Sequence, residues 1–174
     1  MDSRDGGIIK TEGLLAQISE RKMAEQIMEL APYAARNGLA LTEDMAAQIA
    51  SARRQILKRT GRVEINGDAS ARLVRAFIGS RSWSQDDFSY VIGEMMEIFH
   101  WIRNEIRSAL TDDDLISELL EVFDYTCNGD VELMQSKGVE KILRRLNLGD
   151  EGIWEEYEDK GRERWIGYEE DWRE

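Results

Sequence analysis

Four side chains have types suited to acid–base or nucleophilic chemistry: Glu64, Glu97, His100 and Cys127. The chain has one histidine and one cysteine, so a Cys–His pair requires His100 and Cys127 to meet in the fold. Cys127 has no basic neighbour in sequence to lower its pKa, and we expect an inert side chain. The Gly-x-Ser-x-Gly, Walker and Gly-x-Gly-x-x-Gly motifs do not occur. No reaction is indicated, and an enzyme that uses these four residues stays an open alternative.

A spacing that can bind metal, Glu-x-x-His, occurs at Glu97 and His100, preceded by Glu94. Helical di-iron sites need two such motifs, so a chain with one histidine would require a symmetric dimer. At 100° per residue, Glu97 lies opposite the apolar stripe of its helix and His100 about 120° from that stripe. We therefore expect both side chains to face solvent.

A second metal hypothesis concerns residues 124–135, which are similar to an EF-hand calcium loop with a glycine at position 6. Position 12 is Gln135 where a bidentate glutamate is expected, and no second loop accompanies it. A helix that ends at Asn128 and Gly129, followed by a helix capped by Asp130, explains the same sequence without a metal, and we favour it. The candidate ligands are Asp124, Thr126, Asn128 and Glu132.

Two large aromatic residues, Tyr90 and Trp101, share the nominally polar face of a long predicted helix with Glu94 and Glu105. Aromatic side chains on such a face need cover from a second layer of helices or from a partner. We favour cover within the chain and keep both residues as candidates for partner binding.

Residues 150–174 form an acidic tail that is rich in aromatic side chains. They hold 11 acidic and 4 basic residues, so −7 of the net charge of −12 lies here. The aromatic residues, with Gly161 among them, recur every three or four positions and predict one helical stripe. The stripe consists of Trp154, Tyr157, Trp165, Tyr168 and Trp172.

Such a tail should dock, because a purely solvating tail would be poor in aromatic residues. The tail could bind its own domain or a second copy of the chain. The domain offers a basic patch, formed by Arg53, Arg54, Lys58, Arg59 and Arg62. The alternative is a separate partner protein. We favour docking on the chain itself or dimerisation, since a tethered site has a high effective concentration.

The elements that must position these residues are helices, because the chain has one proline and many strong helix formers. A first helix over 13–30 places Leu14, Ile18, Met23, Ile27 and Leu30 at its apolar positions and stops before Pro32. Thr42 and Gly61 are expected to cap the second helix, and a third starts at Asp68 and packs through residues 73–78.

The fourth predicted helix follows Ser84 and Asp87, a spacing similar to a capping box. Its apolar stripe is Phe88, Ile92, Met95, Phe99, Ile102 and Ile106. Thr111 caps the fifth helix, and a last helix ends near Leu146. We predict an all-α, single-domain bundle of five or six helices over residues 1–149, with the acidic aromatic tail at 150–174.

The composition of the chain indicates which partners and which cellular compartment to expect. A net charge of −12 disfavours nucleic acid, whose binding needs clustered basic residues. One cysteine permits no internal disulfide, which fits a reducing cytoplasm. The sequence shows neither a signal peptide nor a run of 18 apolar residues, so we expect no membrane association, and no cofactor is indicated.

The middle of the chain resembles a family of short, functionally uncharacterised bacterial proteins, mostly from anaerobic Firmicutes. The resemblance spans roughly residues 37–146 and rests on NGLALT (37–42), LKRTGRVE (57–64), IFHWIRNE (98–105), LTDDDLI (110–116) and FDYTCNG (123–129). It implies a bacterial cytoplasmic protein and no particular activity. The sequence favours a non-enzymatic protein–protein interaction module, with a metal-responsive protein using the 124–135 loop as the alternative.

Overall fold

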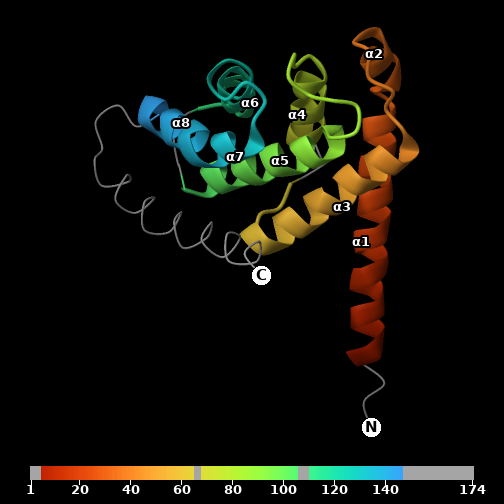
Figure 1. Cartoon of the computed structure of the whole chain (residues 1–174). Coiled ribbons are helices and arrows are strands. Elements are labelled where there is room, and N and C mark those ends of the chain that lie inside the picture. The colour runs from red at the N-terminus through yellow and green to blue at the C-terminus, as the bar shows by residue number, and fades with distance from the viewer. Residues whose placement is uncertain (1–4, 65–67, 106–109, 147–174) are drawn as a thin grey trace, which may run out of the picture.

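The computed structural model describes residues 5–64, 68–105 and 110–146, with side chains from residue 13 onward (Figure 1). The elements are α1 (Asp5–Met28), α2 (Ala31–Arg36), α3 (Glu43–Thr60), α4 (Asp68–Ile78), α5 (Phe88–Glu105), α6 (Asp112–Glu121), α7 (Val131–Leu133) and α8 (Val139–Leu146), with π-helical turns η1 (Val122–Thr126) and η2 (Met134–Gly138). Six of these helices have at least eight residues, and the described part of the chain contains no strand. The predicted all-α bundle of five or six helices is confirmed.

The helix boundaries from α1 to α3 follow local sequence chemistry. Pro32 lies in the first turn of α2, where a missing N–H and a fixed φ are tolerated. Thr42 Oγ1 accepts a hydrogen bond from Met45 N at 3.2 Å and caps α3. Gly61 ends α3 at φ +66°, a left-handed conformation that glycine adopts without strain. The predicted caps of this helix are therefore confirmed.

Helix α1 lies along one side of the molecule, and its N-terminal half extends beyond the other described helices (Figure 1). Its C-terminal half packs against α3 and α4 and buries Met23 and Ile27. Leu14 and Ile18, two predicted apolar positions of the same helix, are exposed. Only part of the predicted apolar face is thus used for packing within the chain.

Helix α5 is the central element, packed against α3, α4 and α6. Its predicted apolar positions are buried as far as the structure describes them, from Phe88 to Ile102. Helix α5 also buries Val91, Met96, Ile98 and His100, which lie off that stripe. Because three helices surround it, α5 is covered over a wider arc than its apolar stripe predicts.

The N-terminal approaches to α5 and α6 differ. Ser84 Oγ donates to Asp87 Oδ2 at 2.8 Å, but α5 begins only at Phe88, so this pair precedes the helix and is not a capping box. Thr111, by contrast, makes a full capping box with Asp114 at the start of α6. The three aspartates of that first turn also complement the positive end of the helix dipole.

The C-terminal part folds back through the two π-helical turns, which pack against each other. Asn128 and Gly129 between them have φ values of +49° and +80°, and Asp130 Oδ1 accepts from Leu133 N at 2.9 Å to cap α7. The predicted break at Asn128-Gly129 is confirmed. This part joins the core through Phe123, and the centroids of the Phe123 and Phe77 rings are 5.6 Å apart. Among the described residues, no helix has both the length and the apolar character needed to cross a bilayer.

Candidate functional site

A buried polar cluster lies where α3, α4 and α5 meet, and we call Arg53, Glu64, Ser70 and His100 the Glu64 cluster. Glu64 Oε2 accepts from Arg53 Nε at 2.9 Å and from Ser70 Oγ at 2.7 Å. Glu64 Oε1 accepts from the backbone N–H of Ser70 at 2.7 Å. Ser70 belongs to the first turn of α4, so the Glu64 carboxylate binds the positive end of that helix.

Glu64 keeps its charge in this cluster. Burial by itself would raise the pKa of the Glu64 carboxyl group, but hydrogen bonds from Ser70 and Arg53 and the positive charge of Arg53 outweigh it and hold the pKa below its ordinary value. Arg53 Nη2 also donates to the Glu64 carbonyl oxygen at 3.3 Å. Arg53 therefore holds both the side chain and the backbone of Glu64, which lies just after the end of α3.

His100 shows the largest departure from expectation, because its side chain is buried although we predicted it to face solvent. Its Nε2 atom lies 3.9 Å from Glu64 Oε2, and neither ring nitrogen has a hydrogen-bond partner among the described residues. Burial lowers its pKa to about 4, with Glu64 opposing this shift and Arg62 and Arg53 adding to it. The imidazole is neutral at pH 7.

The Glu97 prediction was also wrong in part. Its side chain is 13% exposed and lies 3.5 Å from Arg59 Nη1 on α3. The neighbouring helix thus supplies the charge partner of Glu97, so this carboxylate is not a solvated residue opposite the core. Glu97 and His100 are neighbours three residues apart on α5, but Glu97 pairs with Arg59 of α3 whereas His100 lies near Glu64.

The predicted basic patch is not a continuous surface. Arg53 is 6% exposed because it pairs with Glu64 inside the protein. Arg54 pairs with Glu20 of α1, and Arg59 with Glu97 of α5. Of the predicted patch, Arg54, Lys58 and Arg59 remain exposed.

The residues of the calcium hypothesis contact different parts of the body. Asp124 is buried and accepts a hydrogen bond from Ser80 Oγ, and Thr126 Oγ1 accepts from Lys141 Nζ at 2.8 Å. Asn128 and Glu132 are exposed. Within the described ranges no group of three or more His, Cys, Asp or Glu residues could hold a metal ion. Metal binding by this loop stays a prediction, and a calorimetric titration with no heat at millimolar calcium would end it.

Cys127 lies between the two π-helical turns, where it is 1% exposed. Its Sγ atom is 3.9 Å from Met134 Sδ. Burial and the nearby charge of Asp130 raise the pKa of the Cys127 thiol, with Lys141 opposing the shift. These surroundings favour a protonated packing residue over a nucleophile.

The predicted partner-binding residues fall into two groups. Tyr90 is 58% exposed, whereas Trp101 is partly buried and packs against the core. The tail residues Trp154, Tyr157, Trp165, Tyr168 and Trp172 lie outside the described residues.

Comparison with protein-family models identifies the group to which the sequence is related. The model described as a family of unknown function, DUF6323, matches residues 26–152. This match covers most of the chain. The chain belongs to DUF6323. Comparison with curated proteins and with solved structures gave no match.

The DUF6323 match contains the Glu64 cluster and the two π-helical turns, and it ends near the start of the tail. It begins at residue 26, so most of α1 lies before it. That outlying part of α1 carries an exposed apolar surface that we call the α1 patch: Leu14, Leu15 and Ile18, which are 56%, 61% and 43% exposed. Leu14 and Ile18 were predicted as apolar positions of the helix, but helical spacing alone did not reveal that their side chains would be exposed.

Proposed function

We propose that this DUF6323 protein is a non-enzymatic protein–protein interaction module with two contact elements, the α1 patch and the aromatic tail. The observation that carries the proposal is the exposure of the α1 patch on a helix that projects from the body (Figure 1). Clustered apolar side chains on a protein surface mark contact sites more often than isolated ones do.

The projecting half of α1 is the part of the helix that a partner would stabilise. A short helical segment in water is marginal without tertiary packing, and here its apolar side chains are exposed. Burial of one leucine or isoleucine side chain stabilises a contact by roughly 1.5 to 3 kcal/mol. A contact that covers the α1 patch would therefore stabilise both the helix and the assembly.

We assign the partner at the α1 patch to a second copy of this chain. The net charge of the whole chain is −12, which opposes self-association at most of its surface. Residues 8–22, however, hold three basic and two acidic residues, so this segment has a charge of +1. Two such helices can meet about a two-fold axis, where the same patch serves both copies.

The non-enzymatic part of the proposal is supported by the placement of the groups that could do chemistry. The side chains of Glu64 and His100 are 10% and 1% exposed, and Cys127 is packed between the π-helical turns. The charge of Glu64 is used to hold Arg53 and the start of α4. The setting that we propose is the bacterial cytoplasm, favoured by the single cysteine and by the family resemblance.

Sedimentation velocity tests the assignment at concentrations from about 1 to 100 μM, a range that brackets micromolar dissociation constants. We expect the wild-type mass to rise toward that of a dimer. The triple variant Leu14→Gln, Leu15→Gln and Ile18→Gln keeps charge and helix propensity and should stay monomeric. A double variant, Gln17→Ala and Ser19→Ala, changes exposed polar positions of the same helix and should dimerise like the wild type. A wild type that is monomeric throughout contradicts the assignment.

A further inference from the structure

Three buried side-chain nitrogen atoms have no hydrogen-bond partner among the described residues, and they belong to only two residues. They are Nδ1 and Nε2 of His100 and Nε of Arg62. Buried polar groups in proteins are almost always paired, so each exception needs a cause. The side chain of His100 is 1% exposed, which keeps its ring away from water at the protein surface. The two residues therefore call for a partner that the described part of the chain does not supply.

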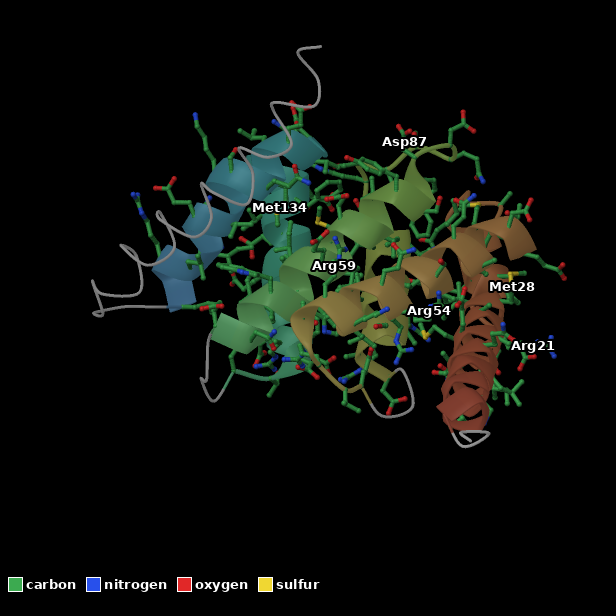
Figure 2. The ribbon with its side chains drawn as sticks, turned by 90° about the horizontal axis from the view of Figure 1, so that it is seen from below. Arg21, Met28, Arg54, Arg59, Asp87 and Met134 are labelled. Atoms are coloured by element: carbon green, nitrogen blue, oxygen red, sulfur yellow. The ribbon has the colours of Figure 1, made fainter. Side chains whose placement is uncertain are left out.

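Arg62 and His100 come together because α3 and α5 lie side by side (Figure 2). At the end of α3, the carbonyl oxygen of Thr60 accepts a hydrogen bond from Asn104 Nδ2 of α5 at 2.9 Å. Arg62 follows Thr60 by two residues, and His100 lies about one helical turn before Asn104. The charge of Arg62 also acts on His100 more strongly than that of Arg53 does. The two residues with unpaired nitrogen atoms are thus neighbours, and we call them the His100 site.

The short segment after α3 directs two charged side chains inward. Val63 is 86% exposed, whereas Nε of Arg62 is inaccessible and the side chain of Glu64 is 10% exposed. Glu64 Oε2 lies 3.9 Å from Nε2 of His100. The carboxylate of Glu64 therefore borders the His100 site on one side.

The charges around the His100 site leave one positive charge without a partner. Glu64 binds Arg53 at 2.9 Å, and Asp112 binds an arginine of α5 at 2.6 Å. Both carboxylates that act on His100 are therefore already paired. Arg62 forms no ion pair within the described ranges. A partner that completes the site must carry negative charge as well as accept hydrogen bonds, and water meets only the second need.

We propose that the His100 site binds a small oxyanion, held between Arg62 and His100. Nε–H of Arg62 and a ring N–H of His100 donate hydrogen bonds to its oxygen atoms, and such bonds are stronger when the donor or the acceptor is charged. The charge of Glu64 opposes the anion, but Arg53 offsets it through their ion pair. Arg62 is partly exposed, so the site borders the protein surface. This inference goes beyond the proposed function, since neither the α1 patch nor the tail takes part.

Nuclear magnetic resonance of protein labelled with ¹⁵N in histidine tests the proposal. The chain has one histidine, so both ring signals report on His100 alone. Sodium sulfate and sodium acetate are titrated separately at neutral pH and constant ionic strength, with sodium chloride as the reference. We expect the ring signals to change and saturate in the millimolar range with sulfate or acetate, and to stay unchanged with chloride. A response to acetate identifies a carboxylate site, and a response to sulfate identifies a site for a tetrahedral oxyanion.

A pair of glutamine variants tests the role of the arginine. Arg62→Gln removes the positive charge and should weaken anion binding at least about tenfold, as expected for the loss of a hydrogen bond to a charged group. Arg54→Gln is the matched control, because Arg54 of α3 (labelled in Figure 2) pairs with Glu20 of α1. It should bind the anion like the wild type. Circular dichroism checks that both variants keep their helices.

The proposal is overturned by a wild type that gives no saturable response, or by a response that chloride reproduces at the same ionic strength. Either result would assign the ring nitrogen atoms to bound water. Equal affinities of the wild type and a folded Arg62→Gln also overturn it. If Arg62→Gln does not fold, Arg62→Lys replaces it, since lysine keeps the charge but lacks Nε–H, and it should bind more weakly than the wild type. The sedimentation result for the α1 patch is independent of each of these outcomes.

Discussion

Glu64 is the residue through which three segments of the body are joined. Its carboxylate binds Arg53 of α3 and the first turn of α4, and it lies close to His100 of α5. A buried charge is tolerated only when such partners compensate for the lost hydration. The Glu64 cluster is therefore a structural connection between α3, α4 and α5, with His100 as a neutral neighbour.

The neutral state of His100 predicts a pH dependence of stability. Its pKa is lowered from 6.5 to about 4 by burial, so the unfolded chain binds a proton in this interval that the folded protein does not. The free energy of unfolding should have its full value above pH 6.5 and decrease as the pH falls toward about 4. The loss from this one group is at most about 3 kcal/mol, at about 1.4 kcal/mol per pKa unit.

Urea unfolding at several pH values from about 7 to 5 measures this slope. His100→Leu removes the titrating group and should flatten the slope in this interval. Other groups that face His100 are Glu64, Arg62, Arg53 and Asp112. The pKa of Glu64 lies below its ordinary value, so its own contribution to stability is lost only at lower pH. An unchanged slope in His100→Leu would show that His100 does not cause it.

At the scale of elements, the contact between η1 and η2 depends on the absence of a side chain at Gly138. A Cβ atom there would lie 2.6 Å from Met134 Sδ, 3.0 Å from Cys127 Sγ and 3.3 Å from Val122 Cγ1. Met134, Cys127 and Val122 are all buried, so they have little space into which to move. The two turns can therefore pack closely only around a glycine.

Gly138→Ala should lower the free energy of unfolding by about 1 to 3 kcal/mol, the usual cost of overpacking a core. Gly93→Ala is the matched control, because its Cβ would meet only Ala52 Cβ at 3.7 Å, an ordinary contact. In the interior of α5 this control should stabilise the protein by up to about 1 kcal/mol, since alanine favours helix more than glycine does. Equal effects of the two substitutions in urea unfolding would refute the packing argument.

At the scale of the whole molecule, one hydrophobic core connects the helices. The cluster of buried side chains extends from Met23 of α1 to Leu143 of α8 and includes the Phe77–Phe123 ring pair between α4 and η1. Elements that share a core lose their packing together, and small domains of this kind unfold cooperatively. The family match covers nearly all of this core, whereas the α1 patch lies outside the match.

We therefore expect one unfolding transition for the described body. Circular dichroism reports on all helices, and tryptophan fluorescence reports in part on Trp83, which packs against Phe88 at 5.7 Å between ring centroids. The two signals should change at the same urea concentration. A separate early transition in circular dichroism alone would mean that α1 or the C-terminal helices melt independently of the core.

Much of the helical architecture could be predicted from sequence because its signals are local. Thr42 and Thr111 cap helices through atoms three residues away, and Gly61 and Gly129 take left-handed conformations that few other residues adopt. Apolar spacing likewise identified the buried residues of α4 and the buried stripe of α5 from Phe88 to Ile102. These features require no knowledge of what packs against a helix.

The candidate site was less predictable, because burial depends on neighbours that are distant in sequence. His100 is buried because α3, α4 and α6 surround α5, although its own position on the helix indicates a polar face. Arg53 is buried because Glu64 lies beside it, and Leu14 and Ile18 are exposed because α1 extends past the body. The sequence by itself determined where helices begin, end and turn, since backbone hydrogen bonding is local. Only the tertiary structure decided which faces are covered, since desolvation and charge pairing depend on the assembled fold.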